Sequence, residues 1–260
     1  MRLVTYGARK GAAIGVRRVV ILGTGTAVGK TYFAQRLIEA LVSTTQLDVI
    51  GIKAIETGFT RPYPTPRDSE RRRAKGSPEG APPAASDAER LERVSRGTPM
   101  RPHPVCVFAA PVSPHLAARR EHASLRTSTI ARAIALHATT IRGWQIVETA
   151  GGVFSPLNAR ETNFDLARRL DPSIWVVIAP DSLGVLHDVR ATLLAMRASG
   201  RAPDHLVLCA ARGIDASTGT NAAELPRVGL PKPIAILGRD GSPGSLGPLV
   251  RKLLARRTRS

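Results

Sequence analysis

The sequence predicts an α/β fold, with a doubly wound and mostly parallel sheet of about seven strands and helices on both faces. One observation is a set of aliphatic runs of strand length, continuous rather than alternating, as in strands that are buried on both faces. The other is that segments with helical apolar spacing or helix-starting residues lie between these runs. The strand-like runs are 19–22, 48–55, 105–108, 145–148, 173–180, 205–211 and 233–238.

The first run leads into a glycine-rich turn, then Lys30-Thr31, then apolar residues at helical spacing. This layout predicts a phosphate-binding loop that takes ATP with Mg²⁺. Backbone N–H groups would face the phosphates, Lys30 would reach the β- and γ-phosphates, and the Thr31 hydroxyl would ligate Mg²⁺. The predicted nucleotide-binding residues of this loop are Gly25, Thr26, Ala27, Val28, Gly29, Lys30 and Thr31.

The loop is longer than the usual phosphate-binding pattern, which places four residues between its first glycine and Gly-Lys. Thr24 stands at the expected glycine position, and Gly23 comes one residue before it. An ordinary glycine-rich turn is the alternative interpretation. We prefer the phosphate-binding loop because the strand, the glycines, Gly-Lys-Thr and the amphipathic helix all agree.

Two charged residues lie near the carboxyl ends of strand-like runs. Lys53 lies near the end of the apolar run 48–55, where a lysine is unusual, and Glu148 ends the run 145–148. In open α/β sheets this edge faces the ligand crevice, so both side chains are candidates for the site. Glu148 would supply the second carboxylate on the Mg²⁺ side, and Gly151 and Gly152 would let the backbone approach a ligand. The alternative is a strand-terminal glutamate beside an ordinary turn.

The segment 60–85 is rich in arginine and proline, has no apolar period, and predicts a flexible surface insertion. Ser86 and Asp87 follow it and begin a helix, where the acid of Asp87 caps the helix or complements its dipole. We therefore expect a flexible N-terminal extension at 1–16 and a single domain at 17–256 that contains the insertion.

The composition carries a large positive charge, with 38 basic and 20 acidic residues and a formal net charge of +18. A nucleic-acid partner is one interpretation, and the insertion 60–85 as an arm for an acidic partner is another. The basic residues are mostly arginine, spread over the chain and not interleaved with aromatics. We favour a solvated basic surface and expect no nucleic-acid partner.

The remaining composition bears on location and metal chemistry. Cys106 and Cys209 lie in apolar runs, which indicates buried thiols, a reducing compartment and a cytoplasmic location. No apolar run is long enough for a membrane span. The six histidines show no metal-ligand spacing, so we assign none of them to a metal.

Taken together, the motifs resemble those of the dethiobiotin synthetase family over about residues 17 to 240. They are GTGTAVGKT, GIKAIETG, SDAERL, FAAPVSPH, VETAGGVFSPL and DSLGVLHDV, in the family's order. The longer phosphate loop is the spacing that this family uses. The resemblance implies an ATP-dependent cyclo-ligase of biotin biosynthesis that forms C–N bonds. It also implies a homodimer that acts on 7,8-diaminononanoate, CO₂ and ATP.

The resemblance implies a role for each matching residue. Lys30 and Lys53 match the catalytic lysines, with Lys53 on the substrate carbamate and the γ-phosphate. Thr31, Asp87 and Glu148 match the Mg²⁺ ligands. Leu183 and Gly184 match a loop that reaches the substrate from the second subunit. The substrate-binding set is Thr26, Lys53, Thr57, Gly151, Gly152, Leu183 and Gly184.

Three positions depart from the family pattern. Ala54 replaces a common proline, and His187 replaces a common asparagine near the substrate tail. Ala211 or Arg212 stands where the family usually has an asparagine that reads adenine. The nucleotide base and the contact with the substrate tail therefore stay open.

The implied reaction begins with a carbamate on one substrate amine, which attacks the γ-phosphate to give a carbamic–phosphoric anhydride. The second amine then closes the ureido ring. The main alternative is a P-loop switch ATPase of partitioning or scaffold type, with or without action on nucleic acid. Such proteins commonly carry an extra lysine early in the loop, where this chain has Gly23-Thr24-Gly25. Amidoligases of ring substrates fit less well, because no glutaminase-like Cys-His region follows.

Overall fold

The computed structural model describes residues 16–59, 85–97, 104–138, 141–241 and 243–255. The predicted N-terminal extension at 1–16 and insertion at 60–85 lie almost wholly outside these residues. The predicted division into extension, domain and insertion therefore stays a prediction.

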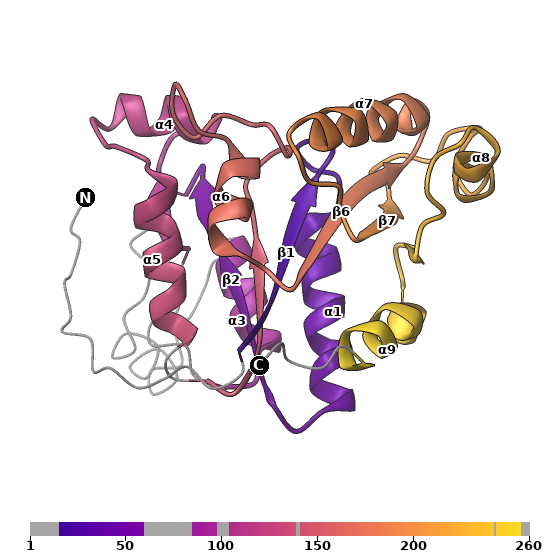
Figure 1. Ribbon diagram of the computed structural model, residues 1–260, viewed down its shortest axis with the longest axis horizontal. Coiled ribbons are helices and arrows are strands. Elements are labelled where there is room, and N and C mark those ends of the chain that lie inside the picture. The colour runs from indigo at the N-terminus through magenta and orange to yellow at the C-terminus, as the bar shows by residue number, and fades with distance from the viewer. Residues whose placement is uncertain (1–15, 60–84, 98–103, 139–140, 242, 256–260) are drawn as a thin grey trace, which may run out of the picture.

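Six parallel strands form the main sheet, in the order β2-β5-β1-β6-β7-β8 (Figure 1). Their bounds are β1 Arg17–Gly23, β2 Asp48–Lys53, β5 Gly143–Glu148, β6 Ile174–Asp181, β7 His205–Ala210 and β8 Ala235–Leu237. The doubly wound parallel sheet predicted from the sequence is confirmed. Because all the strands are parallel, the loops after β1, β2 and β5 lie at one edge of the sheet.

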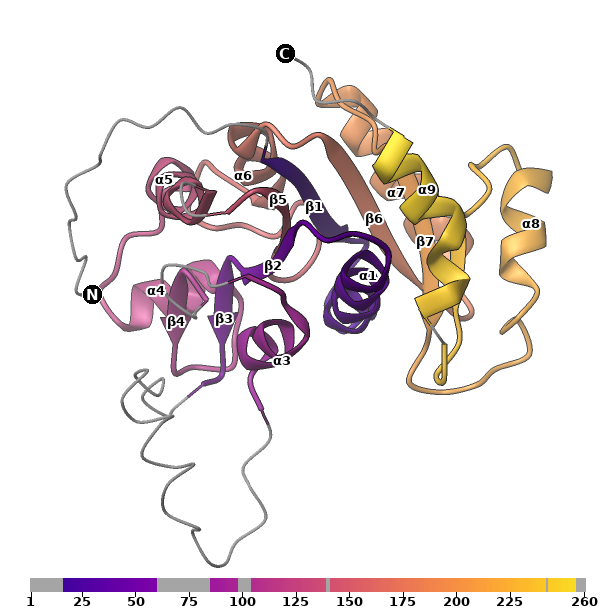
Figure 2. The ribbon, with the colours of Figure 1, turned by 90° about the horizontal axis from the view of Figure 1, so that it is seen from below.

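The predicted strand run 48–55 is divided in two. The N–H of Ala54 still donates to the carbonyl of Glu148 on β5, while its carbonyl accepts from the N–H of Cys106. The chain thereby changes partner, and β3 (Ile55–Thr57) pairs in parallel with β4 (Cys106–Phe108) in a second small sheet. Figure 2 shows β3 and β4 beside β2. The strand predicted at 105–108 therefore lies outside the main sheet.

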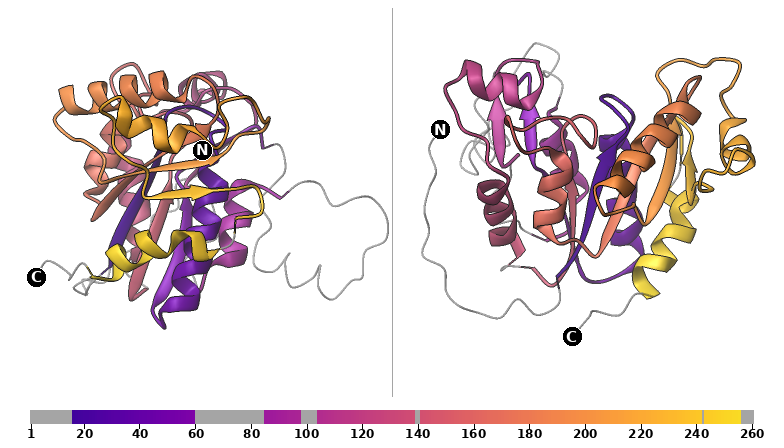
Figure 3. Two further views of the ribbon diagram at one scale, coloured as in Figure 1. Left: turned by 90° about the vertical axis from the view of Figure 1, so that its right-hand side faces the viewer. Right: turned by 45° about the horizontal axis from the view of Figure 1, so that its top comes forward.

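Helices cover both faces of the main sheet (Figure 3, left). One layer holds α1 (Lys30–Thr44), α3 (Asp87–Val94) and α9 (Gly247–Ala255), which follows the short 3₁₀ helix η1 (Pro243–Leu246). The other face packs against α4 (Pro114–Arg120), α5 (Thr127–Ala138), α6 (Asn163–Leu170), α7 (Val185–Ala198) and α8 (Asn221–Arg227). Within the described residues, no helix is long and apolar enough to cross a membrane.

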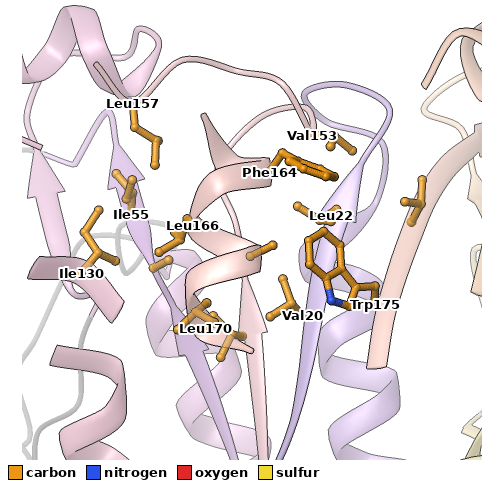
Figure 4. Packing of buried hydrophobic residues seen from close by; sticks show 14 of the residues in the cluster. Val20, Leu22, Ile55, Ile130, Val153, Leu157, Phe164, Leu166, Leu170 and Trp175 are labelled. Carbon is orange, nitrogen blue, oxygen red and sulfur yellow. The ribbon is translucent and has the colours of Figure 1, made fainter. Parts of the chain in front are cut away.

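The two hydrophobic cores follow the alternation of side chains along β1. Val20 and Leu22 point to one core, and Val19 and Ile21 point to the other. In the first core Phe164 of α6 meets Trp175 of β6 edge to face, with ring centroids 5.4 Å apart (Figure 4). Full burial on both faces explains why the strand runs are continuous rather than alternating.

The sequence analysis assigned no residue range to a helix at 163–170 or 221–227, where the structure has α6 and α8. Helix α6 has a sequence signal, because Thr162 and Asp165 form a capping box at its start. Helix α8 has only seven residues and contains Pro226, so its pattern is too short to stand out.

The strand order places the ligand crevice. β2 lies on one side of β1, and β5 later fills the position between these two strands. The next strand, β6, lies on the other side of β1. The order therefore reverses at β1, where open α/β sheets bind ligands beyond the carboxyl ends of their strands.

Candidate active site

The loop between β1 and α1 is attached to both of its neighbours in the sheet. The N–H of Thr24 donates to the carbonyl of Ile178 on β6 at 2.9 Å. The carbonyl of Gly23 accepts from the N–H of Val153, in the loop after β5, at 2.9 Å. Lys30 folds back, and its Nζ donates to the carbonyl of Gly25 at 2.8 Å. The loop is therefore held in place before any phosphate group enters.

The start of α1 suits an anion. The first turn of α1 has no acidic residue, and the N-cap residue Gly29, directly before the helix, supplies no side-chain hydrogen bond. The positive end of the helix dipole is thus left for a phosphate. Gly29 has φ 96°, and a Cβ there would lie 2.7 Å from the Cβ of Cys209 on β7. Only glycine fits this position, because both the conformation and the close approach exclude a side chain.

Lys53, Asp87, Glu148 and Thr31 meet beside this loop. Lys53 and Glu148 are register partners across β2 and β5. Lys53 Nζ lies 2.5 Å from Glu148 Oε1 and 2.8 Å from Asp87 Oδ2. Thr31 Oγ1 donates to the same Glu148 Oε1 at 2.8 Å. Four residues that the sequence placed in four separate motifs thus form one cluster.

Burial and neighbouring charges set the protonation of the cluster. Burial lowers the pKa of Lys30 to about 8, with Glu148 opposing the shift and Lys53 adding to it. Burial also disfavours the Lys53 cation, but Glu148 and Asp87 outweigh it and raise the pKa of Lys53. Burial opposes ionisation of Asp87, yet Lys53, Thr31 and Arg90 together lower the pKa of Asp87. Lys53 and Asp87 therefore stay charged near neutral pH.

Burial raises the pKa of the Glu148 carboxyl, and Lys53 acts in the opposite direction. The Glu148 side chain is 1% exposed, and its Oε2 has no hydrogen-bond partner among the described residues. A buried carboxylate oxygen without a partner is costly unless a cation binds it.

The donor set fits Mg²⁺. Thr31, Asp87 and Glu148 offer hard oxygen ligands, and the unpartnered Oε2 of Glu148 adds one more. The described residues contain no group of three or more His, Cys, Asp or Glu side chains that could hold a metal. Protein-bound Mg²⁺ commonly takes one or two carboxylates and completes its shell with water and substrate phosphates. Two carboxylates and one hydroxyl match that pattern.

The sequence analysis missed Glu56, which orders the start of α3. Its Oε1 accepts from the N–H of Asp87 at 2.8 Å, and its Oε2 lies 3.4 Å from the N–H of Ala88. Ser86 forms a capping box with Glu89 at the same helix end. Glu56 thereby fixes the backbone that carries Asp87. The available signal was an acid three residues after Lys53, in KAIETG.

The glycine loop after β5 packs against the phosphate loop. A Cβ at Gly152 would lie 3.3 Å from the carbonyl oxygen of Thr24, and one at Gly151 would lie 3.7 Å from Thr26 Oγ1. The side chain of Asn163, another residue that sequence reasoning missed, donates to the carbonyl of Gly152 at 2.9 Å. The predicted substrate residues Thr26, Gly151 and Gly152 are therefore brought together.

The other predicted substrate residues lie further out. Thr57 ends β3, four positions beyond Lys53. Leu183 is 82% exposed, and its N–H donates to Asp215 Oδ2 at 2.9 Å. Gly184, with φ 93°, is the N-cap residue directly before α7. Within the described chain, neither Leu183 nor Gly184 is hydrogen-bonded to the Lys53 cluster.

The loops that follow β7 and β8 are joined to each other and to α1. The guanidinium of Arg239 donates to the carbonyls of Ala211 and Arg212. The hydroxyl of Tyr32 lies 2.7 Å from the carbonyl oxygen of Gly238. These contacts fix the backbone of Ala211 and Arg212. The family resemblance places the adenine-reading asparagine at one of these two positions.

Known proteins resemble this chain over most of its length. A family model described as "AAA domain" matches residues 17–224. The "ATP-dependent dethiobiotin synthetase BioD" of Anaeromyxobacter dehalogenans is 34% identical, over 85% of this chain and 90% of the relative. The protein of the same name from Rhodopirellula baltica is 30% identical, over 80% of this chain and 78% of the relative. A solved ParA family ATPase from Chlorobium tepidum TLS shares 11% identity at a TM-score of 0.48, over 94% of this chain and 93% of its own.

Proposed function

The chain belongs to the ATP-dependent dethiobiotin synthetase family, and from this membership we propose the reaction at its site. It is an ATP-dependent cyclo-ligase, and its proposed substrates are 7,8-diaminononanoate, CO₂ and ATP. The proposed products are dethiobiotin, ADP and phosphate. One observation supports this most directly: Lys30 of the phosphate loop and the Lys53–Glu148–Asp87 cluster share one edge of the sheet.

The nucleotide would lie along the loop 25–31 with its phosphates at the start of α1. Lys30 would leave the carbonyl of Gly25 and reach the β- and γ-phosphates. Thr31, Asp87 and Glu148 would hold Mg²⁺ at the same point. When bound there, Mg²⁺ supplies positive charge that offsets the charge of the phosphates.

The reaction would run in three steps. A substrate amine attacks CO₂ and loses a proton, which gives a carbamate. A carbamate oxygen then attacks the γ-phosphorus, the bond to the β-phosphate oxygen breaks, and ADP leaves. The second amine attacks the carbonyl carbon of this anhydride, loses a proton, and expels phosphate as the ureido ring closes.

The chain contributes charge and position rather than a nucleophile. Carbamate and triphosphate are both anions, and Lys30 and Lys53 would offset their repulsion. Thr26, Thr57 and the backbone of Gly151 and Gly152 would hold the diamine beside the loop. Phosphoryl transfer needs this kind of positioning more than a covalent intermediate.

We also infer a homodimer, in which Leu183 and Gly184 complete the partner's site. Leu183 and Ile214 are each 82% exposed, and the bond between Leu183 and Asp215 brings their two loops together. Exposed apolar side chains on adjoining loops favour a subunit contact. The cytoplasmic location inferred from the cysteines stays a prediction.

The decisive assay incubates the full chain with MgATP, bicarbonate and 7,8-diaminononanoate. Mass spectrometry follows the product while phosphate release is measured in parallel. We expect one dethiobiotin for each phosphate released. Phosphate release that is the same with and without the diamine would contradict the proposal and favour a switch ATPase. Stimulation of that release by DNA or RNA would favour action on nucleic acid.

A further inference from the structure

We propose that Lys53 is the exchangeable counter-ion of the metal-site carboxylates, leaving them when the divalent cation binds and turning to the substrate carbamate. This inference rests on the proposed function and adds an order of binding to it. It goes beyond assigning Lys53 to the substrate, because it gives this lysine two successive sets of partners.

The contacts show that one ammonium group is bound by both proposed metal-binding carboxylates. Lys53 Nζ contacts Glu148 Oε1 at 2.5 Å and Asp87 Oδ2 at 2.8 Å. Thr31 Oγ1 donates to the same Glu148 oxygen at 2.8 Å. Lys53 is only 5% exposed, so solvent does little to screen its charge. The proposed ligands of Mg²⁺ are thus already engaged, directly or through Glu148, with a cation of this chain.

Mg²⁺ and the ammonium group would compete for these oxygens. Mg²⁺ needs its oxygen ligands at about 2.1 Å in a near-octahedral arrangement. An ion bound to Glu148 Oε1 and Asp87 Oδ2 would require the position that Lys53 Nζ holds. Binding through the unpartnered Glu148 Oε2 would still place the ion close to the ammonium group, where two positive charges repel in a buried site. Lys53 is therefore expected to move.

The charges suggest where Lys53 goes. Two carboxylates and one lysine leave the cluster with one uncompensated negative charge. A divalent cation neutralises both carboxylates without the lysine. The lysine then becomes available to an incoming anion. Lys53 ends β2 at the sheet edge that carries the phosphate loop and the glycine loop. The exchange makes the cation a requirement for capture of the carbamate.

The first test follows the accessibility of Lys53 in the unaltered protein. The chain has six lysines, so each can be followed by mass spectrometry after a brief reductive methylation. The reaction is run without nucleotide across a Mg²⁺ titration, with ionic strength matched by KCl. We expect Lys53 labelling to rise at least tenfold relative to the exposed Lys252 at saturating Mg²⁺. An unchanged Lys53 rate at saturation would overturn the exchange, and it would indicate that both cations stay in the site.

The second test measures cation affinity directly. Mn²⁺ binding is followed by electron paramagnetic resonance in the wild type, Lys53→Met and Lys252→Met. We expect Lys53→Met to bind Mn²⁺ at least tenfold more tightly, because the competing cation is gone, and Lys252→Met to stay within twofold. Equal or weaker binding by Lys53→Met would contradict the proposal.

The labelling test decides the matter if Lys53→Met does not fold, since it uses the wild-type chain. The two levels of the proposal also fail separately. Dethiobiotin formation without cation-dependent labelling would overturn only the exchange. Cation-dependent labelling without dethiobiotin would leave the exchange standing and overturn the proposed reaction.

Discussion

Two regions of this molecule gather positive charge, at opposite edges of the same sheet. At the carboxyl edge, Lys30 and Lys53 are buried, and fixed oxygen atoms hold them. At the amino edge, before β7 and β8, a cavity of about 320 Å³ is lined by the exposed Arg197, Lys232 and Lys252. None of these three forms an ion pair with a described residue. The two regions are both positively charged, but they differ in the burial and in the pairing of their cations.

The acids explain the difference. In the carboxyl-edge cluster, Glu148 and Asp87 are committed to Lys53 itself. In the amino-edge cavity, Asp204 accepts from the N–H of Trp175 and from Arg201. A chain with a net charge of +18 must leave many cations unpaired, which makes the exposed set unremarkable. Burial with a fixed partner, rather than charge, therefore distinguishes a candidate site here.

The strongest test of this comparison removes the buried lysine. Lys53→Ala should lower turnover by about 10³-fold, because positive charge at the transferred phosphoryl group is lost. It should also lower the free energy of unfolding by about 3 kcal/mol, because Glu148 stays buried without its partner. Steady-state kinetics and urea unfolding measure the two effects, with Lys252→Ala as the matched control. Unchanged turnover in Lys53→Ala would refute its assigned role.

The depressed pKa of Lys30 gives a second test, in the pH dependence of ATP affinity. The Lys30 cation must be present to bind phosphate, and its pKa is about 8. ATP affinity should therefore be full below pH 8 and fall as the pH rises above it, by up to about tenfold for each pH unit. Calorimetric titration from pH 6.5 to 9.5 measures the slope. Lys30→Arg keeps its charge throughout this range and should flatten the slope even if it binds more weakly.

A third and smaller effect concerns the positioning of Asp87. Glu56→Ala removes the acceptor for the N–H groups of Asp87 and Ala88. We expect a loss of about 1 kcal/mol in unfolding free energy, as for a lost helix cap, and a several-fold rise in the Mg²⁺ concentration for half-maximal activity. Glu56→Gln keeps an acceptor oxygen and should recover most of the Mg²⁺ response. A purely structural role would lower stability without moving that response.

The smallest expected effect is at the amino-edge cavity. Lys232→Ala and Lys252→Ala should change the unfolding free energy by less than about 0.5 kcal/mol, as exposed substitutions do. Turnover should stay the same within error. A loss of activity in either variant would break the comparison, because it would show that exposed and unpaired cations contribute to function.

Much of the carboxyl-edge site was predictable from sequence. Lys53 lies near the end of one apolar run and Glu148 ends another, and parallel strands bring such ends to one edge. Asp87 was open to interpretation as a helix-starting acid, and the structure shows that it begins α3 and also contacts Lys53. The predicted roles of these residues in binding Mg²⁺ and carbamate stay predictions.

The residues that escaped prediction act on backbone atoms. Glu56 accepts from the N–H of Asp87, Asn163 donates to the carbonyl of Gly152, and Arg239 donates to the carbonyl of Ala211. Every residue type except proline offers the same N–H and C=O groups, so such contacts leave no residue pattern at the partner position. The division of the second strand at Ala54 was missed for the same reason.

The pairing of Lys53 with Glu148 also depends on the correct register of two strands that are far apart in the sequence. The two residues are 95 positions apart in the chain and meet only when β2 and β5 associate in register. A shift of β2 by one position would turn Lys53 to the other face of the sheet and dissolve the cluster. During refolding, α1 forms from neighbouring residues, whereas the cation site must wait for this distant strand. A divalent cation that binds only the completed cluster would therefore favour the correctly registered sheet over its slipped competitors.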